Sequence, residues 1–96
     1  MRQYELMMIH RSDLEEPDVR DQIAAVETTV GDNGSVESTD FWGKRRFAYE
    51  IDHMTEGYYS VVEFQGDAEL VENLDRSLLL ADSVVRHKLL RRYDRE

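Results

Sequence analysis

Two stretches with helical periodicity alternate with stretches of strand periodicity, and their order limits which folds the chain can adopt. In the first helical stretch, which begins at Pro17, the apolar stripe is formed by Val19, Ile23, Val26 and Val30. In the second, which follows Asp67, the stripe is formed by Leu70, Leu74 and Leu78. Proline is tolerated in the first turn of a helix, and aspartate is a favourable N-cap residue. We therefore expect amphipathic helices over about 17–30 and 68–78.

Four other segments alternate between apolar and polar side chains, or carry apolar residues on both sides, as strands do. They span about residues 2–10, 36–51, 58–64 and 84–92. The resulting order, β-α-β-β-α-β, predicts a ferredoxin-like α+β sandwich with a four-stranded antiparallel-type sheet. Right-handed crossovers would place the first and third strands centrally and parallel, with both helices on one face and the other face open. We expect a single domain over residues 1–92 and a short mobile tail at 93–96.

The segment 41–51 combines a strand pattern with a concentration of aromatic and cationic residues. It contains the single tryptophan, Trp42, and three consecutive cations at 44–46. Strict alternation would place Phe41, Gly43, Arg45, Phe47, Tyr49 and Ile51 on one side of the strand, and Trp42, Lys44, Arg46, Ala48 and Glu50 on the other. Cations next to aromatic rings suit a polyanion, because they contact phosphates while the rings stack on bases. The alternative is a cationic edge strand whose charges prevent sheet aggregation.

The charge of the chain is negative overall but unevenly distributed. The net charge of −9 argues against indiscriminate binding of nucleic acid. Residues 13–40 contain nine acidic residues and one cation, whereas residues 84–96 contain five cations and two acidic residues. Together with Arg2 and the cations at 44–46, the C-terminal cations could form one basic face opposite an acidic one. The alternative is that the acidic helices only keep a small domain in solution.

The sequence shows no pattern typical of a catalytic or metal-binding site. There is no cysteine, and the three histidines, at 10, 53 and 87, are isolated and lack metal-ligand spacing. The serines lack a nucleophile-elbow motif, and the glycines form no phosphate-binding loop. We therefore expect neither a cofactor nor a metal. The N-terminus lacks the apolar core of a signal peptide, and no apolar run approaches the roughly 20 residues that span a bilayer, so a cytosolic or organelle-matrix protein is expected.

Five blocks of the sequence, taken in order, are similar to one known family. They are Met-Arg-Gln-Tyr-Glu at 1–5, Gly-Lys-Arg-Arg-Phe-Ala-Tyr at 43–49, Gly-Tyr at 57–58, Leu-Asp-Arg-Ser-Leu at 74–78 and Val-Val-Arg at 84–86. On these blocks the chain resembles the ribosomal protein S6 family of the bacterial small subunit. The matches extend from residue 1 to about residue 92, and the family's fold is the one that the periodicity predicts.

The resemblance implies a structural ribosomal protein, not an enzyme, that binds the central domain of small-subunit ribosomal RNA together with ribosomal protein S18. The candidate contacts to RNA phosphates and sugars are eight cations: Arg2, Lys44, Arg45, Arg46, Arg86, Lys88, Arg91 and Arg92. The candidates for stacking on splayed bases are Tyr4, Trp42, Tyr49 and Tyr59. The chain is then expected within the ribosome, in the bacterial cytoplasm or in an organelle matrix.

The acidic surplus of the chain suggests where a basic partner would bind. We expect S18 to contact part of the acidic surface, or the open sheet face with Met7 and Ile9. A hypothesis from another class is a small dimeric ligand-binding protein or enzyme, in which His10, His53 and Tyr59 supply polar groups to a pocket on the open face. A further hypothesis is a protein-interaction module that binds through a sheet edge.

Overall fold

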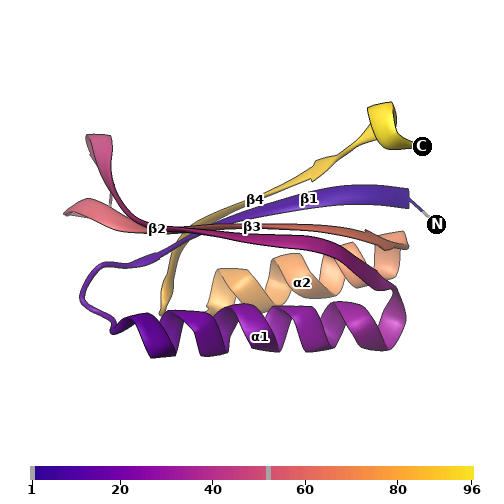
Figure 1. The fold of residues 1–96 in the computed structure, drawn as a ribbon, viewed down its shortest axis with the longest axis horizontal. Coiled ribbons are helices and arrows are strands. Elements are labelled where there is room, and N and C mark those ends of the chain that lie inside the picture. Colours follow the sequence, from indigo (N-terminus) through magenta and orange to yellow (C-terminus); the bar gives the residue numbers. More distant parts are fainter. Residues whose placement is uncertain (1, 52) are drawn as a thin grey trace.

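The computed structural model describes residues 2–51 and 53–96 and shows two helices packed on one face of a four-stranded sheet (Figure 1). The elements in chain order are β1 (Arg2–Arg11), α1 (Glu16–Asn33), β2 (Ser35–Ile51), β3 (Met54–Gly66), α2 (Ala68–Leu80), β4 (Val84–Arg91) and the short 3-10 helix η1 (Tyr93–Arg95). The strands lie in the order β2-β3-β1-β4. This arrangement confirms the ferredoxin-like β-α-β-β-α-β sandwich. Within the described residues, neither α-helix is long and apolar enough to cross a membrane.

The two central strands, β1 and β3, are antiparallel, so the expectation that they run parallel is wrong. The reason lies in the connections. The crossover through α1 returns the chain parallel to β1, but it places β2 one strand away and leaves a gap beside β1. The tight β2–β3 connection then reverses the chain, and β3 fills that gap in the opposite direction. Every neighbouring pair in the sheet is therefore antiparallel.

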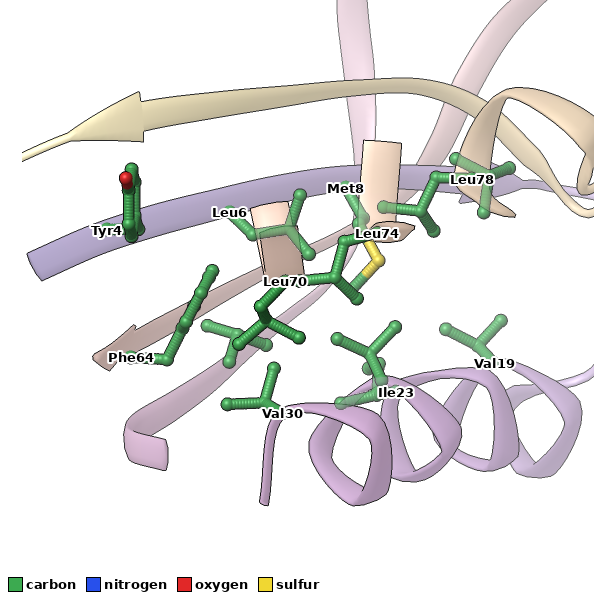
Figure 2. Packing of buried hydrophobic residues seen from close by; sticks show 13 residues of the cluster. Tyr4, Leu6, Met8, Val19, Ile23, Val30, Phe64, Leu70, Leu74 and Leu78 are labelled. Carbon is green, nitrogen blue, oxygen red and sulfur yellow. The ribbon is translucent and has the colours of Figure 1, made fainter. Parts of the chain in front are cut away.

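The core lies between the helices and one face of the sheet, as Figure 2 shows. The helical stripes are buried as their spacing predicts, with Val19 and Val30 of α1 fully covered. From the sheet, the facing side chains are those at alternate positions, including Leu6 and Met8 of β1 and Phe64 of β3. These three are 0 % exposed, so burial of apolar surface between the two layers holds the domain together.

The start of α2 is fixed by Asp67. Its Oδ1 accepts a hydrogen bond of 2.9 Å from the backbone N–H of Leu70, the N-cap interaction expected from the sequence. We expect Asp67→Ala to lower the free energy of unfolding by about 1 kcal/mol, because one helix N–H loses its partner. Urea unfolding measures the change. Glu72→Ala, which removes the same charge from an exposed site in the same helix, is the control. Equal stability of the two variants would contradict the capping role.

β2 does not alternate strictly, because a bulge interrupts it at Gly43. Its pairing register with β3 shifts between Phe41 and Gly43, and Gly43 has a φ of +80°, which glycine adopts without strain. Before the bulge, the Phe41 ring stacks on Tyr58 at 6.1 Å between centroids. After it, Lys44 Nζ lies 5.1 Å from the centroid of the same ring. Phe41 and Lys44 therefore share a side, although strict alternation would separate them.

The same bulge brings two other residues of β2 together on the opposite side. Trp42 stacks on Tyr59 with ring centroids 6.1 Å apart and an interplanar angle of 4°. Phe47 contacts the same tyrosine edge-on at 6.0 Å. Trp42 and Phe47 were expected on opposite sides of the strand, and that expectation is wrong. The bulge adds one residue to β2, so every later side chain points to the opposite side from the one that strict alternation predicts.

The C-terminal segment, expected to be a mobile tail, forms η1 and lies against the sheet. The backbone N–H of Arg92 donates to Gln3 O at 2.7 Å, and the N–H of Gln3 donates to Glu96 Oε1 at 2.9 Å. Arg95 forms an ion pair with Glu63 of β3. The chain thus ends beside its beginning, where Figure 1 marks both termini.

Candidate nucleic-acid interface

The sheet face opposite the helices changes in character along its length. Because Leu6 and Met8 point to the helices, their odd-numbered neighbours in β1 point the other way. From the termini toward the β2–β3 turn, the pairs between β1 and β3 on this open face are Glu5–Glu63, Met7–Val61 and Ile9–Tyr59. The β4 residues beside them are, in the same order, Leu90, Lys88 and Arg86. The open face therefore carries ion-paired carboxylates at one end, Met7 with Lys88 beside it in the middle, and aromatic and cationic side chains at the other end.

An aromatic cluster of Trp42, Phe47 and Tyr59 occupies the end of the open face near the β2–β3 turn. Trp42 remains 47 % exposed although its ring lies flat against Tyr59. The cluster packs tightly because Gly57 has no side chain. A Cβ there would stand 2.9 Å from both Phe47 Cζ and Ile9 Cγ2. An exposed flat ring backed by other rings is suited to stacking on a base.

Four cations lie on the strands near this aromatic cluster, two on β2 and two on β4. Arg45 and Arg46 follow the bulge in β2, where Arg45 shares the open side with Phe47 and Arg46 faces the other side, and Arg86 and Lys88 belong to β4. All four are exposed, and none forms an ion pair with another described residue. An exposed guanidinium or ammonium without an internal carboxylate keeps its charge available for phosphate. We call these four residues the hairpin-end cations.

Lys44 and Arg2, also selected from the sequence, are set apart from the hairpin-end cations. Lys44 lies over the Tyr58 ring on the helix side of β2. Arg2 begins β1, opposite Gly66, whereas Lys88 lies beside Met7, Arg86 beside Ile9 and Arg45 level with Arg11, about 17 to 30 Å further along the strand. The eight selected cations therefore do not form one continuous surface.

Arg91 and Arg92 are already occupied by carboxylates of the chain. Arg92 Nη2 lies 2.9 Å from Asp94 Oδ2, and its Nη1 lies 3.1 Å from Glu5 Oε1. The hydrogen bond with Asp94 is the main cause that raises the pKa of Arg92 above its ordinary value. Arg91 contacts Glu96 at 3.0 Å, and this hydrogen bond likewise raises the pKa of Arg91. These two arginines help to hold the C-terminal segment, and a phosphate would have to compete with their carboxylates.

The four aromatic residues selected for stacking also separate in the structure. Tyr4 is only 7 % exposed and stacks on Phe64 in the core, with centroids 5.6 Å apart, so it cannot reach a base without unfolding. Its selection is corrected for that reason. Tyr49 is 85 % exposed near the end of β2. Trp42 and Tyr59 lie together on the open face. Sequence reasoning did not select Phe47, although a glycine within a strand pattern is a known sign of a bulge.

The residues that an enzyme or ligand-binding site would need do not converge. His10 is fully buried on the helix side, where its Nε2 lies 3.0 Å from Ser60 Oγ. Burial lowers the pKa of His10 to about 4. Tyr59 points to the opposite face, and His53 lies in the β2–β3 turn with a φ of +64°. Within residues 2–51 and 53–96, no group of three or more metal-ligating side chains is found.

Comparison with known proteins agrees with the fold. The sequence profile of ribosomal protein S6 matches residues 3–91, nearly the whole chain. The chain belongs to the ribosomal protein S6 family. Members of this family are structural proteins of the small ribosomal subunit, so the chain is a ribosomal component of bacterial type and not an enzyme.

Individual S6 relatives match over almost their full length. Small ribosomal subunit protein bS6 of Salinispora tropica is 50 % identical over 94 residues, covering 95 % of this chain and 96 % of the relative. The bS6 protein of Symbiobacterium thermophilum is 46 % identical, covering 95 % and 97 %. The crystal structure of 30S ribosomal protein S6 from Thermotoga maritima superimposes with a TM-score of 0.92 at 27 % identity, covering 97 % of this chain and 89 % of that one.

Proposed function

We propose that this S6 protein binds the central domain of small-subunit ribosomal RNA together with ribosomal protein S18. The observation that supports this most directly is the group of hairpin-end cations, which have no carboxylate partner among the described residues and lie beside an exposed aromatic cluster. In a chain with 21 acidic residues, the unpaired cations Arg45, Arg86 and Lys88 on the open face, with Arg46 next to them at the β2 edge, indicate a site for an external anion.

In this proposal the cations position the RNA and the aromatic rings recognise unstacked bases. Arg45, Arg46, Arg86 and Lys88 contact phosphates, which fixes orientation without reading sequence. Trp42 offers the exposed side of its ring for stacking, because Tyr59 covers only the other side. Lys44 and Arg2 contact RNA only where it extends around the β2 edge or reaches the far end of β1.

S18 is proposed to cover the middle of the open face and the end near the termini. Met7 is partly exposed in this region and Leu90 is 46 % exposed, whereas Ile9 and Val61 are buried. Large exposed apolar groups in a chain of 96 residues are typical of a protein interface. The carboxylates of Glu5 and Glu63 already pair with Arg92 and Arg95, so the attraction for a basic partner comes from the net charge of −9. The pair would then present a more cationic surface to RNA than this chain presents alone.

The proposal predicts that RNA binding depends on the partner. We expect the isolated chain to bind a central-domain rRNA fragment weakly, and the equimolar mixture with S18 to bind it at least tenfold more tightly and with a steeper dependence on salt. Filter binding at several salt concentrations measures both quantities. Equal affinity with and without S18, or tight binding by this chain alone, would contradict the cooperative role.

A further inference from the structure

A hollow of about 340 Å³ lies where the end of β2 stands over the open face of the sheet. It is lined by residues 47–51 of β2, Tyr59 of β3 and Arg86 of β4. In Figure 1 the end of β2 rises away from the helix layer, and residues 47–51 at that end line the hollow. Its volume falls at the lower end of the range of small-ligand sites, about 300–1,000 Å³.

The lining of the hollow combines aromatic rings with one cation. Phe47 and Tyr59 form an edge-on pair inside it, with centroids 6.0 Å apart. Tyr49 belongs to the same lining but is 85 % exposed, and it forms no aromatic pair with the other described residues. Arg86 has no described carboxylate partner, although Glu50 also lines the hollow. A tyrosine ring that is free to stack and an unpaired guanidinium therefore line the same hollow. Together they suit a nucleotide, because the tyrosine can stack on its base and the guanidinium can bind its phosphate.

We propose that this hollow holds one unstacked nucleotide of single-stranded RNA, with its base against Tyr49 and Tyr59 and its phosphate on Arg86. This inference rests on the proposed function and specifies the RNA that the hairpin end accepts. A base within an RNA duplex keeps its faces covered by its neighbours, so only a loop or bulge nucleotide fits the site. The hollow is shallow and open, so most of the affinity comes from the rest of the RNA and the hollow selects the unpaired position.

Removal of the Tyr49 ring tests the site with little risk to folding, because that ring is mostly exposed. We expect Tyr49→Ala to weaken binding of the central-domain rRNA fragment by the complex with S18 between fivefold and a hundredfold, the range for loss of one base stack. Leu80→Ala removes another large exposed side chain, 78 % exposed, at the end of α2 in the helix layer, and should change the affinity less than twofold. An unchanged affinity for Tyr49→Ala would overturn the proposal.

A photocrosslinking phenylalanine analogue at position 49 identifies what occupies the hollow. In the same complex we expect a crosslink to a nucleotide that is unpaired in the free RNA. Crosslinking to S18 would show that the hollow takes a protein segment, and crosslinking only to duplex nucleotides would exclude an unstacked base. If the wild-type complex with S18 does not bind the rRNA fragment, the proposed function fails as well. If it binds but Tyr49→Ala and the crosslink give negative results, only the nucleotide site fails.

Discussion

Replacing the four hairpin-end cations, Arg45, Arg46, Arg86 and Lys88, by glutamine is expected to reduce affinity for the central-domain rRNA fragment on the order of a hundredfold at 0.15 M salt. Each phosphate contact to single-stranded RNA contributes about 0.7 to the slope of log K against log salt, so four contacts lower the slope by about 3. Filter binding across a salt series, with the S18 complex in each case, gives the slope and the affinity together.

The control for this loss is a change of charge on the helix layer. Arg20 of α1 and Arg76 of α2 are exposed, and the double replacement of both by glutamine removes two positive charges far from the open face. Its proper comparison is the double replacement of Arg86 and Lys88 alone, which should lower affinity about tenfold. If both double variants weaken binding equally, net charge rather than the hairpin end controls the interaction, and the proposed interface is wrong.

The second large effect expected is a loss of stability between pH 7 and pH 4 that depends on His10. Burial lowers the pKa of this histidine to about 4 in the folded chain, against 6.5 when unfolded. Below pH 6.5 His10 is therefore protonated in the unfolded state but stays neutral in the folded state. The free energy of unfolding falls as the pH falls, until His10 is also protonated in the folded state at about pH 4. The shift corresponds to about 3 kcal/mol over the whole range and about 2 kcal/mol between pH 6.5 and pH 5.

His10→Gln isolates this contribution. Glutamine does not titrate, and its side chain can still form a hydrogen bond with Ser60, which contacts His10 in the wild type. Urea unfolding at pH 7 and pH 5, followed by Trp42 fluorescence, should show a smaller loss of stability in the variant. This pH window avoids a second effect. Hydrogen bonds lower the pKa of four carboxylates, so their protonation destabilises the fold only at lower pH; they are Asp13, Glu37, Asp94 and Glu96. Equal losses in both proteins would contradict the assignment.

The architecture of this S6 protein was predictable from periodicity because each element has a dominant apolar face. The stripe of Val19, Ile23 and Val30 is helical at any reasonable choice of boundaries, and all three are buried. The direction of the central strands was predicted wrongly, because right-handed crossovers alone do not show that the β2–β3 hairpin places β3 antiparallel beside β1. The side on which Phe47 lies was also missed. The bulge at Gly43 moves Phe47 to the other side of β2.

The candidate site was less predictable than the fold, because charge pairing is set by tertiary contacts. In the sequence, Arg86 and Arg92 look equivalent. In the structure Arg86 is exposed, whereas Arg92 lies between Glu5 and Asp94. No local pattern shows that residue 92 will stand beside residue 5, since that depends on β4 pairing with β1. Tyr4 illustrates the same limit, because both sides of β1 carry apolar residues and only the packed helices show which side is covered.

The central place of β1 in the sheet has a consequence for how the protein is made. The first strand of this domain forms its ladders with two strands that are translated much later: Arg2 lies opposite Gly66, and Tyr4 lies opposite Arg91. Until residue 91 has been added, β1 can pair with β3 but not with β4. The side chains of Leu6 and Met8 are then incompletely buried. Folding of this domain therefore waits for the synthesis of β4, and the nascent chain must keep β1 from aggregating until then.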